Sequence, residues 1–157
     1  MQLPVPTGAM WTMITDVTRI GEWSPECTSA RWLDRTVPGP RSGARFLARN
    51  RFPGGSTGDV TCVVTECEPD RVFAWSVMDG DGERAAEGSR WRYELAPGSL
   101  DGWTLVFHRF EHGPGQSGLR EAASNDATAT GRRLGELCTN MSATLAAMVG
   151  ARAEVGS

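Results

Sequence analysis

The sequence predicts an α+β fold, in which an antiparallel sheet packs against a long C-terminal helix. Apolar residues near the N-terminus recur at helical spacing, and residues from about 28 to 111 alternate with a period of two between turns rich in Gly and Pro. From residue 134 to 148 the apolar residues return to helical spacing. We expect a single domain over residues 1–157, because a chain of this length buries one core.

The first expected element is a short helix with Thr7 as its N-cap. Its apolar stripe is formed by Met10, Met13, Ile14 and Val17. A second short turn spans Thr18–Trp23 and ends before Pro25, because the residue that precedes a proline disfavours helical geometry. We expect Trp23 and Pro25 to hold the helix-to-strand turn, since an indole buries a large area and proline restricts its own backbone.

Six strands are expected next, separated by short turns that contain Gly, Pro or Asp. Their predicted ranges are Ser29–Leu33, Ala44–Phe52, Asp59–Glu68, Arg71–Met78, Ser89–Ala96 and Trp103–Glu111. Such closely spaced strands favour a meander of antiparallel hairpins.

The last expected element is one amphipathic helix over about residues 117–149. The residues that form its apolar stripe at intervals of three and four are Leu134, Leu137, Cys138, Met141, Leu145 and Met148. This stripe is expected to face the sheet.

Composition and charge exclude several classes of function. The net charge of −3 and the pI of about 5.4 provide no basic surface for a phosphate backbone, so we expect no nucleic-acid partner. No stretch approaches the roughly 20 apolar residues that span a bilayer, so we expect no membrane insertion and a cytoplasmic location.

The four cysteines lack the short paired spacings of a zinc site. Cys62 and Cys67 are expected on opposite faces of one strand. We interpret all four as reduced and mostly buried, with a metal or disulfide role as the alternative. No metal is therefore expected. No cofactor is expected either, because no Gly-Lys-Ser or Gly-x-Gly-x-x-Gly run that would bind a nucleotide follows a predicted strand.

Two segments carry a family resemblance. They are the run Ile20-Gly21-Glu22-Trp23-Ser24-Pro25-Glu26-Cys27, followed by Trp32, and the run from Gly43 to Arg51. Together they resemble the SRPBCC superfamily of START-like helix-grip proteins, which includes polyketide cyclase/dehydrase and lipid-transport families, and most of all its actinobacterial members. The resemblance implies a curved antiparallel sheet wrapped around the C-terminal helix, with a ligand cavity between them. Because family members begin with a full strand, the segment Met1–Val5 predicts a first strand that is short or missing.

Such a cavity is lined by alternate strand residues and by the inner stripe of the last helix. One face of the Ala44–Phe52 strand carries Phe46, Ala48, Asn50 and Phe52 and is the expected interior. The expected ligand-binding residues are Phe46, Asn50, Trp75, Trp91, Tyr93, Phe107 and Met141. The alternative for each aromatic residue is a place in the packed core.

His108 and Arg109 are the candidate catalytic residues, because a histidine titrates near neutral pH and a guanidinium can bind a carboxylate or an enolate oxygen. Both faces of their strand are apolar early and polar late, so the parity of the strand leaves open which of the two faces inward. A structural or solvent-facing role is the alternative for each. The acids Asp16, Glu22 and Glu26 are interpreted as solvated, with an acid pair as the alternative.

These features predict that the protein binds a hydrophobic small molecule, polyketide-like or lipid-like, in an internal cavity, with cyclase or dehydratase activity as an open question. The alternative function is a non-catalytic interaction or stress-response module of the same fold. A hydrophobic small molecule is the expected partner, and the sequence leaves open whether the chain forms a homodimer.

Overall fold

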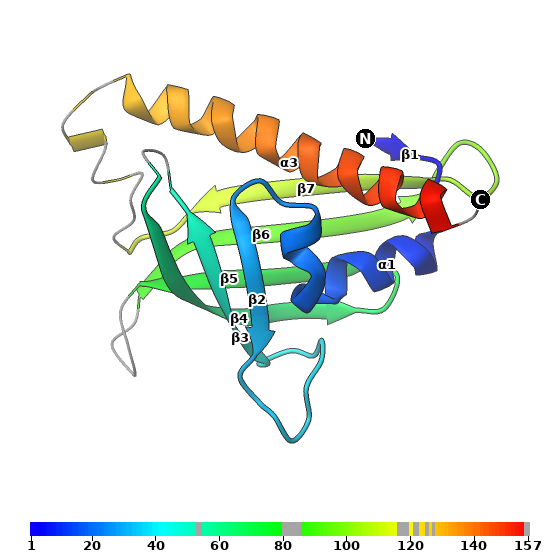
Figure 1. Cartoon of the computed structure of the whole chain (residues 1–157), viewed down its shortest axis with the longest axis horizontal. Coiled ribbons are helices and arrows are strands. Elements are labelled where there is room, and N and C mark those ends of the chain that lie inside the picture. Colours follow the sequence, from blue (N-terminus) through cyan, green and yellow to red (C-terminus); the bar gives the residue numbers. More distant parts are fainter. Residues whose placement is uncertain are drawn as a thin grey trace.

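The computed structural model describes residues 1–52, 55–79, 86–115, 120, 123–124, 126 and 128–155 (Figure 1). The bounds of the elements are β1 Gln2–Leu3, α1 Thr7–Thr15, the 3-10 helix η1 Val17–Glu22, β2 Cys27–Trp32, β3 Arg45–Arg51, β4 Thr57–Glu68, β5 Val72–Asp79, β6 Ala86–Pro97, β7 Thr104–His112 and α3 Ala129–Val155. This order agrees with the one predicted from hydrophobic periodicity.

The strands form one seven-stranded antiparallel sheet in the order β1-β7-β6-β5-β4-β3-β2. From β2 to β7 each strand pairs with the next one in the sequence, so the predicted meander is confirmed. The sheet curves, and α3 lies across it with α1 and η1 nearby (Figure 1). This arrangement is the helix-grip fold that the family resemblance implies.

The first strand is present but short. β1 pairs with β7 only through Gln2 with Leu105 and Leu3 with Thr104. The terminal ammonium of Met1 also donates a hydrogen bond to the carbonyl oxygen of Val106 at 2.8 Å. Within the described residues, the part of β7 that follows Val106 therefore has a neighbouring strand only on its β6 side.

Thr7 does not cap α1, contrary to the prediction. The helix begins at Thr7 itself and Pro6 occupies the N-cap position, without a side-chain capping bond. Because Thr7 lies inside the first turn, its hydroxyl reaches the sheet, where its oxygen lies 3.1 Å from the hydroxyl oxygen of Thr104. The residue thus joins α1 to β7.

The long helix begins later and ends later than predicted, at Ala129 and Val155. A turn precedes it, in which Oδ1 of Asp126 accepts hydrogen bonds from the backbone N–H and the hydroxyl of Thr128. A carboxylate that bonds the backbone two residues ahead favours a turn or a helix start over a helix interior. Residues 117–119, 121–122, 125 and 127 of the predicted helix lie outside the described residues. In the described part of the chain, no helix is long and apolar enough to cross a membrane.

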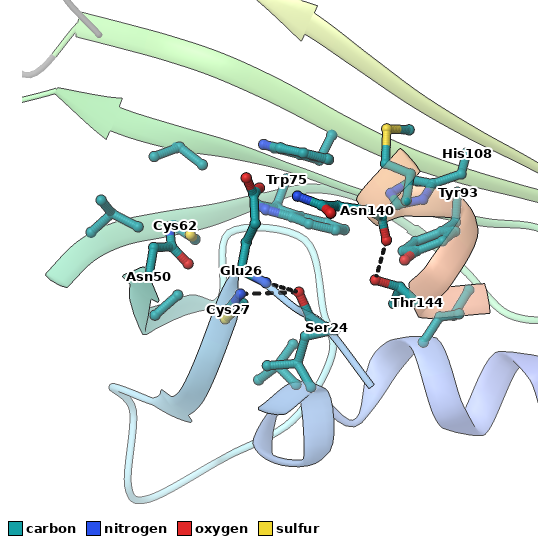
Figure 2. Close-up of a pocket in the computed structure, with 18 of the residues that line it drawn as sticks. Ser24, Glu26, Cys27, Asn50, Cys62, Trp75, Tyr93, His108, Asn140 and Thr144 are labelled. Carbon is teal, nitrogen blue, oxygen red and sulfur yellow. Dashed lines mark hydrogen bonds between the residues drawn. The ribbon is translucent and has the colours of Figure 1, made fainter. Parts of the chain in front are cut away.

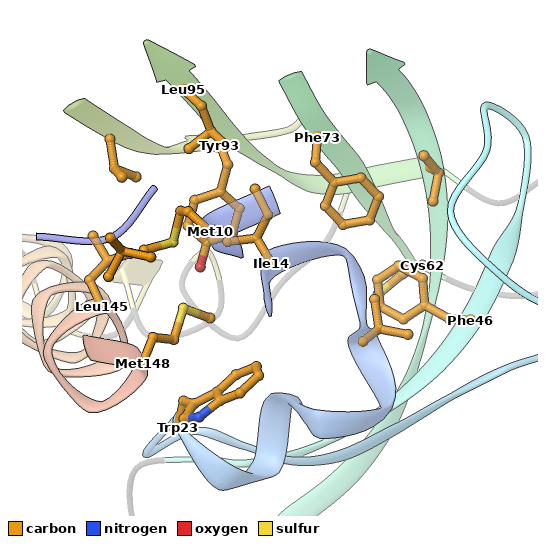
Figure 3. Close-up of a cluster of buried hydrophobic side chains, with 14 of the residues drawn as sticks. Met10, Ile14, Trp23, Phe46, Cys62, Phe73, Tyr93, Leu95, Leu145 and Met148 are labelled. Atoms are coloured by element: carbon orange, nitrogen blue, oxygen red, sulfur yellow. The ribbon is translucent and has the colours of Figure 1, made fainter. Parts of the chain in front are cut away.

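The core lies between the concave face of the sheet and the three helical segments (Figure 3). Phe73, Met10 and Met148 are fully buried and come from β5, α1 and α3. The predicted stripe of α3 is only partly buried. Leu137, Leu145 and Met148 are covered, whereas Leu134 is 44% exposed and Cys138 is exposed as well. Leu134 and Cys138 are one turn apart, so they share a side of the helix that the core does not reach.

Cys67 lies on the same face of β4 as Cys62, which corrects the prediction of opposite faces. Cys62 pairs with Val77 and Cys67 with Phe73, and both partners are on the inner face of β5. The register shifts between Val64 and Glu66, where a β-bulge inserts one extra residue into β4. One inserted residue moves every later side chain of the strand to the opposite face from the one that simple alternation predicts. All four cysteines are free, but only Cys62 is buried, which corrects the prediction that most of them are: Cys27 and Cys67 are half-buried and Cys138 is exposed.

Candidate functional site: an aromatic pocket beneath the long helix

A pocket of about 120 Å³ lies between the concave face of the sheet and the helical segments (Figure 2). The sheet supplies its aromatic floor, η1 and the following turn supply one wall, and α3 supplies another. The residues that line it are Ile14, Val17, Ile20, Ser24, Glu26, Cys27, Phe46, Ala48, Asn50, Val60, Cys62, Phe73, Trp75, Val77, Trp91, Tyr93, His108, Leu137, Asn140, Met141 and Thr144.

The aromatic floor follows directly from strand register. Trp75 of β5 pairs with Trp91 of β6, so both indoles stand on the same face of the sheet. Their rings are nearly parallel, with centroids 6.2 Å apart and an interplanar angle of 7°. Phe46 of β3 meets Trp75 edge-on, with centroids 6.1 Å apart. Flat rings at these separations form an apolar surface suited to an aromatic or greasy ligand.

Six of the seven residues predicted to bind ligand line this pocket. They are Phe46, Asn50, Trp75, Trp91, Tyr93 and Met141. The five strand residues lie where the strand parity predicts, and Met141 lies on the inner stripe of α3. The part of all six in binding stays a prediction. Phe52, which the same parity put in the interior, is 39% exposed because it lies just beyond the end of β3.

Phe107 does not line the pocket, which corrects the prediction. It is 44% exposed and belongs to the outer set of β7 residues, whereas Val106, two residues before His108, is buried. Arg109 is also on the outer face, where its Nη2 lies 3.5 Å from Oε2 of Glu94. The structure therefore resolves the open parity of β7: His108 faces the pocket and Arg109 faces solvent.

His108 is held between aromatic rings. Its imidazole stacks on the phenol ring of Tyr93, with centroids 3.9 Å apart and an interplanar angle of 19°, and lies 5.8 Å from the Trp91 ring. Both ring nitrogens are buried, and neither has a hydrogen-bond partner among the described residues. Burial lowers the pKa of His108 to about 3, because an apolar environment disfavours the charged ring. The imidazole is therefore neutral at physiological pH.

A polar rim, which sequence reasoning missed, lies at the wall formed by the turn after η1. The hydroxyl oxygen of Ser24 accepts hydrogen bonds from the backbone N–H groups of Glu26, at 3.2 Å, and of Cys27, at 3.0 Å. This turn directs the Glu26 side chain toward the pocket, where its carboxylate forms an ion pair with Arg133 of α3. Each of these two side chains is only 20% exposed, so Glu26 is not the solvated acid that was predicted.

Asn140 and Thr144 are two further pocket residues that the sequence analysis passed over. The Thr144 hydroxyl donates a hydrogen bond to the backbone carbonyl of Asn140 at 2.8 Å, and Thr144 is 5% exposed. The sequence did contain a signal for them, because Asn140 and Thr144 lie three residues after Leu137 and Met141 and so share their side of the helix. Two polar residues that interrupt an apolar helical face mark a position where the helix meets something other than packed core.

The thiols of the pocket are poor nucleophiles. Burial raises the pKa of Cys27 to about 11 and raises the pKa of Cys62 as well, so both are protonated at neutral pH. Among the described residues, no group of three or more His, Cys, Asp or Glu side chains could hold a metal ion. The groups that the described lining presents are apolar rings, the neutral imidazole of His108 and the polar side chains of Ser24, Glu26, Asn50, Asn140 and Thr144.

The comparisons with known proteins agree with this fold. Among solved structures, the chain is similar to the polyketide-cyclase-like protein Cgl2372 from Corynebacterium glutamicum, with 28% identity, a TM-score of 0.60 and coverage of 99% of this chain and 90% of that one. It is also similar in fold to the di-domain ARO/CYC protein StfQ of the steffimycin biosynthetic pathway, with 15% identity, a TM-score of 0.70 and coverage of all of this chain and 50% of that one.

Protein Ms6760 from Mycobacterium smegmatis is a third neighbour, with 15% identity, a TM-score of 0.62 and coverage of 99% of this chain and 88% of that one. A search of curated protein sequences finds no significant match. The sequence profile of the family described as polyketide cyclase / dehydrase and lipid transport matches residues 1–145. The chain therefore belongs to the polyketide cyclase/dehydrase and lipid transport family.

Proposed function

We propose that this protein binds an uncharged hydrophobic small molecule, polyketide-like or lipid-like, in the aromatic pocket. The observation that carries the proposal is His108, a neutral imidazole buried among aromatic rings with two unpartnered nitrogens. A buried polar group without a hydrogen bond costs about 1–3 kcal/mol, and a hydroxyl or carbonyl group of a ligand would remove that cost at one of the two nitrogens.

The size and charge of the pocket limit which ligands can bind in it. Its volume of about 120 Å³ is close to that of an engineered apolar cavity of about 150 Å³ that admits benzene, so it accommodates a portion the size of one ring. Glu26 is the charged residue among the described residues of the lining, and its carboxylate is already paired with the guanidinium of Arg133, so the lining offers no free positive charge to an anion. A neutral His108 offers no charge to attract one. An uncharged ring is therefore favoured over a carboxylate of the same size.

A cyclisation or dehydration would use the same contacts. The pocket would hold two parts of a flexible chain close together, and the N–H of His108 would donate a hydrogen bond to a carbonyl oxygen as it gains enolate charge. Because its conjugate acid forms only at very low pH, His108 suits the role of a hydrogen-bond donor better than that of a general base.

Two matched probes test the proposal. Acetophenone and benzoate have nearly the same size, but only benzoate is charged. We expect acetophenone to bind at least tenfold more tightly and to quench the fluorescence of Trp75 and Trp91, because these indoles line the pocket. Tighter binding of benzoate, or no binding of either probe, would contradict the proposal.

Two variants locate the contact. His108→Phe keeps a ring to stack on Tyr93 but removes both nitrogens, and we expect acetophenone binding to weaken roughly fivefold to thirtyfold, in line with about 1–2 kcal/mol for a buried hydrogen bond. Arg109→Ala is the matched control from the adjacent, outward-facing position, and its affinity should stay within about twofold of the wild type. Equal effects of both variants would remove His108 from the site.

The alternative function is a surface interaction module. Under that alternative Trp75, Trp91 and Phe107 would fill the interior, but the two indoles line an open pocket and Phe107 is exposed, which supports ligand binding. Native mass spectrometry of the protein purified from its own host separates the two functions. A bound hydrophobic compound is expected for a binding protein, whereas an unliganded protein that also fails to bind acetophenone would favour the module.

A further inference from the structure

A second hollow, of about 320 Å³, adjoins the aromatic pocket on the β7 side of α3. We call it the α3–β7 groove. Val106 and Phe110 of β7 form one side, and Leu134, Cys138 and Ser142 of α3 form the other. In Figure 1, α3 runs along β7 over this region.

The α3–β7 groove and the aromatic pocket share three lining residues, His108, Leu137 and Met141. These three side chains stand between the two hollows and are the boundary common to both. Methionine is unbranched and adapts its shape readily, so Met141 can make room for a ligand that passes it. The unpartnered His108 lies at this boundary.

The groove also accounts for the apolar side of α3 that the core leaves uncovered. Leu134 is 44% exposed and Cys138 is exposed, although both are apolar residues at helical spacing. The lining of the groove contains no charged side chain among the described residues, apart from the terminal ammonium of Met1, which is hydrogen-bonded to Val106. Such a lining suits an alkyl chain.

We propose that the two hollows form one elongated site for an uncharged ligand, with a ring in the aromatic pocket, a carbonyl or hydroxyl group at His108 and an alkyl chain in the α3–β7 groove. The inference rests on the proposed function and extends it, because it sets the order of the three parts of the ligand. The polar group lies between the ring and the chain, since His108 lies between the two hollows.

Alkyl phenyl ketones have this order, so acetophenone, butyrophenone, hexanophenone and octanophenone form the test series. Burial of a methylene is worth about 0.8 kcal/mol when complete, and the groove is partly open. We therefore expect affinity to rise about twofold to fourfold for each added methylene. An affinity that does not change with chain length would overturn the elongated site.

A blocking variant assigns the gain to the groove. Ser142→Trp places an indole in the α3–β7 groove and should abolish the dependence on chain length, while acetophenone still binds as in the wild type. That unchanged acetophenone affinity also verifies that the variant is folded. Ala143→Trp is the matched control, because Ala143 is the exposed next residue of the helix and lines neither hollow. A full chain-length gain in Ser142→Trp would contradict the proposal.

Cys138 provides an independent readout in the unmodified chain. It lines the groove and is exposed, so iodoacetamide should alkylate it readily. Octanophenone should protect Cys138, acetophenone should not, and neither should change the labelling of Cys67, which lines neither hollow. Unprotected Cys138 in the presence of saturating octanophenone would overturn the inference. Failure of acetophenone to bind would count instead against the proposed function, because protection of Cys138 is measured separately.

Discussion

The carboxylate of Glu26 pairs with the guanidinium of Arg133, and this contact joins the turn before β2 to the second turn of α3. The two residues are 107 positions apart in the sequence, and each side chain is 20% exposed. Nη1 of Arg133 also lies 3.4 Å from Oε2 of Glu136 of the same helix. The N-terminal half of α3, which leaves Leu134 exposed, is therefore held at the pocket partly by electrostatics.

This ion pair should contribute measurably to stability. A double-mutant cycle with Glu26→Gln and Arg133→Gln, read by urea unfolding, is expected to give a coupling free energy of about 1 kcal/mol, between the values for exposed and buried pairs. The control cycle uses Asp126 and Arg132, whose side chains are 45% and 64% exposed, and should give close to zero. Equal couplings in the two cycles would mean that burial of the Glu26 pair has no energetic effect.

His108 should make the protein less stable in acid. Its pKa is about 3 in the folded protein and about 6.5 in an unfolded chain, so between these values the unfolded state binds the extra proton. The free energy of unfolding should therefore fall as pH is lowered from about 6.5, by at most about 1.4 kcal/mol per pH unit from this residue. Above pH 7 the residue should have no such effect.

The variant His108→Phe separates this contribution from that of the carboxylates, which also destabilise the protein in acid. The unfolding free energy of both proteins is measured by urea titration at pH 4, 5, 6 and 7.5. As pH falls, the value for the wild type should decrease more than the value for the variant. Parallel curves would indicate that His108 is protonated in the folded protein or is not buried as described.

Trp23 should be a major contributor to stability. The residue is 5% exposed, and its indole packs in the hydrophobic core (Figure 3). The central guanidinium carbon of Arg19 lies 4.9 Å from the centre of the indole ring. Trp23→Ala is expected to lower the free energy of unfolding by about 3–5 kcal/mol, because it leaves a large cavity. Leu100→Ala is the control at a residue 58% exposed, and its effect should be below about 0.5 kcal/mol. An unchanged melting temperature in Trp23→Ala would refute the role of the indole.

Two glycine-to-alanine substitutions should change the stability of the protein in opposite directions. A Cβ atom on Gly21 would lie 2.1 Å from the backbone carbonyl oxygen of Thr28, so Gly21→Ala must push η1 away from β2 and should cost about 2 kcal/mol or more. Gly135 lies within α3 with nothing within 4 Å of such an atom, so Gly135→Ala should stabilise the protein by about 0.5–1 kcal/mol. Thermal unfolding of both variants checks the pair, and a neutral Gly21→Ala would contradict the close approach.

The local pattern of the chain was sufficient to predict the order of the elements and the inward faces of three strands. Phe46, Trp75, Trp91 and Tyr93 line the pocket as their alternation indicates, because side chains along a regular strand alternate strictly between its two faces. The apolar positions of the last helix were likewise identifiable. The residue at which this helix begins was not, since the side chain of Asp126 forms a turn ahead of it by accepting hydrogen bonds from Thr128.

Tertiary structure decided the rest, because each remaining feature depends on residues far apart in the sequence. The bulge after Val64 reverses the expected face of Cys67, and pairing across the sheet turns His108 inward and Arg109 outward on a strand whose two faces are equally apolar. The pairing of Glu26 with Arg133 and the division of the α3 stripe between core and groove arise only when the helix is laid across the sheet. Periodicity determines which residues share a face, whereas only packing determines what that face meets.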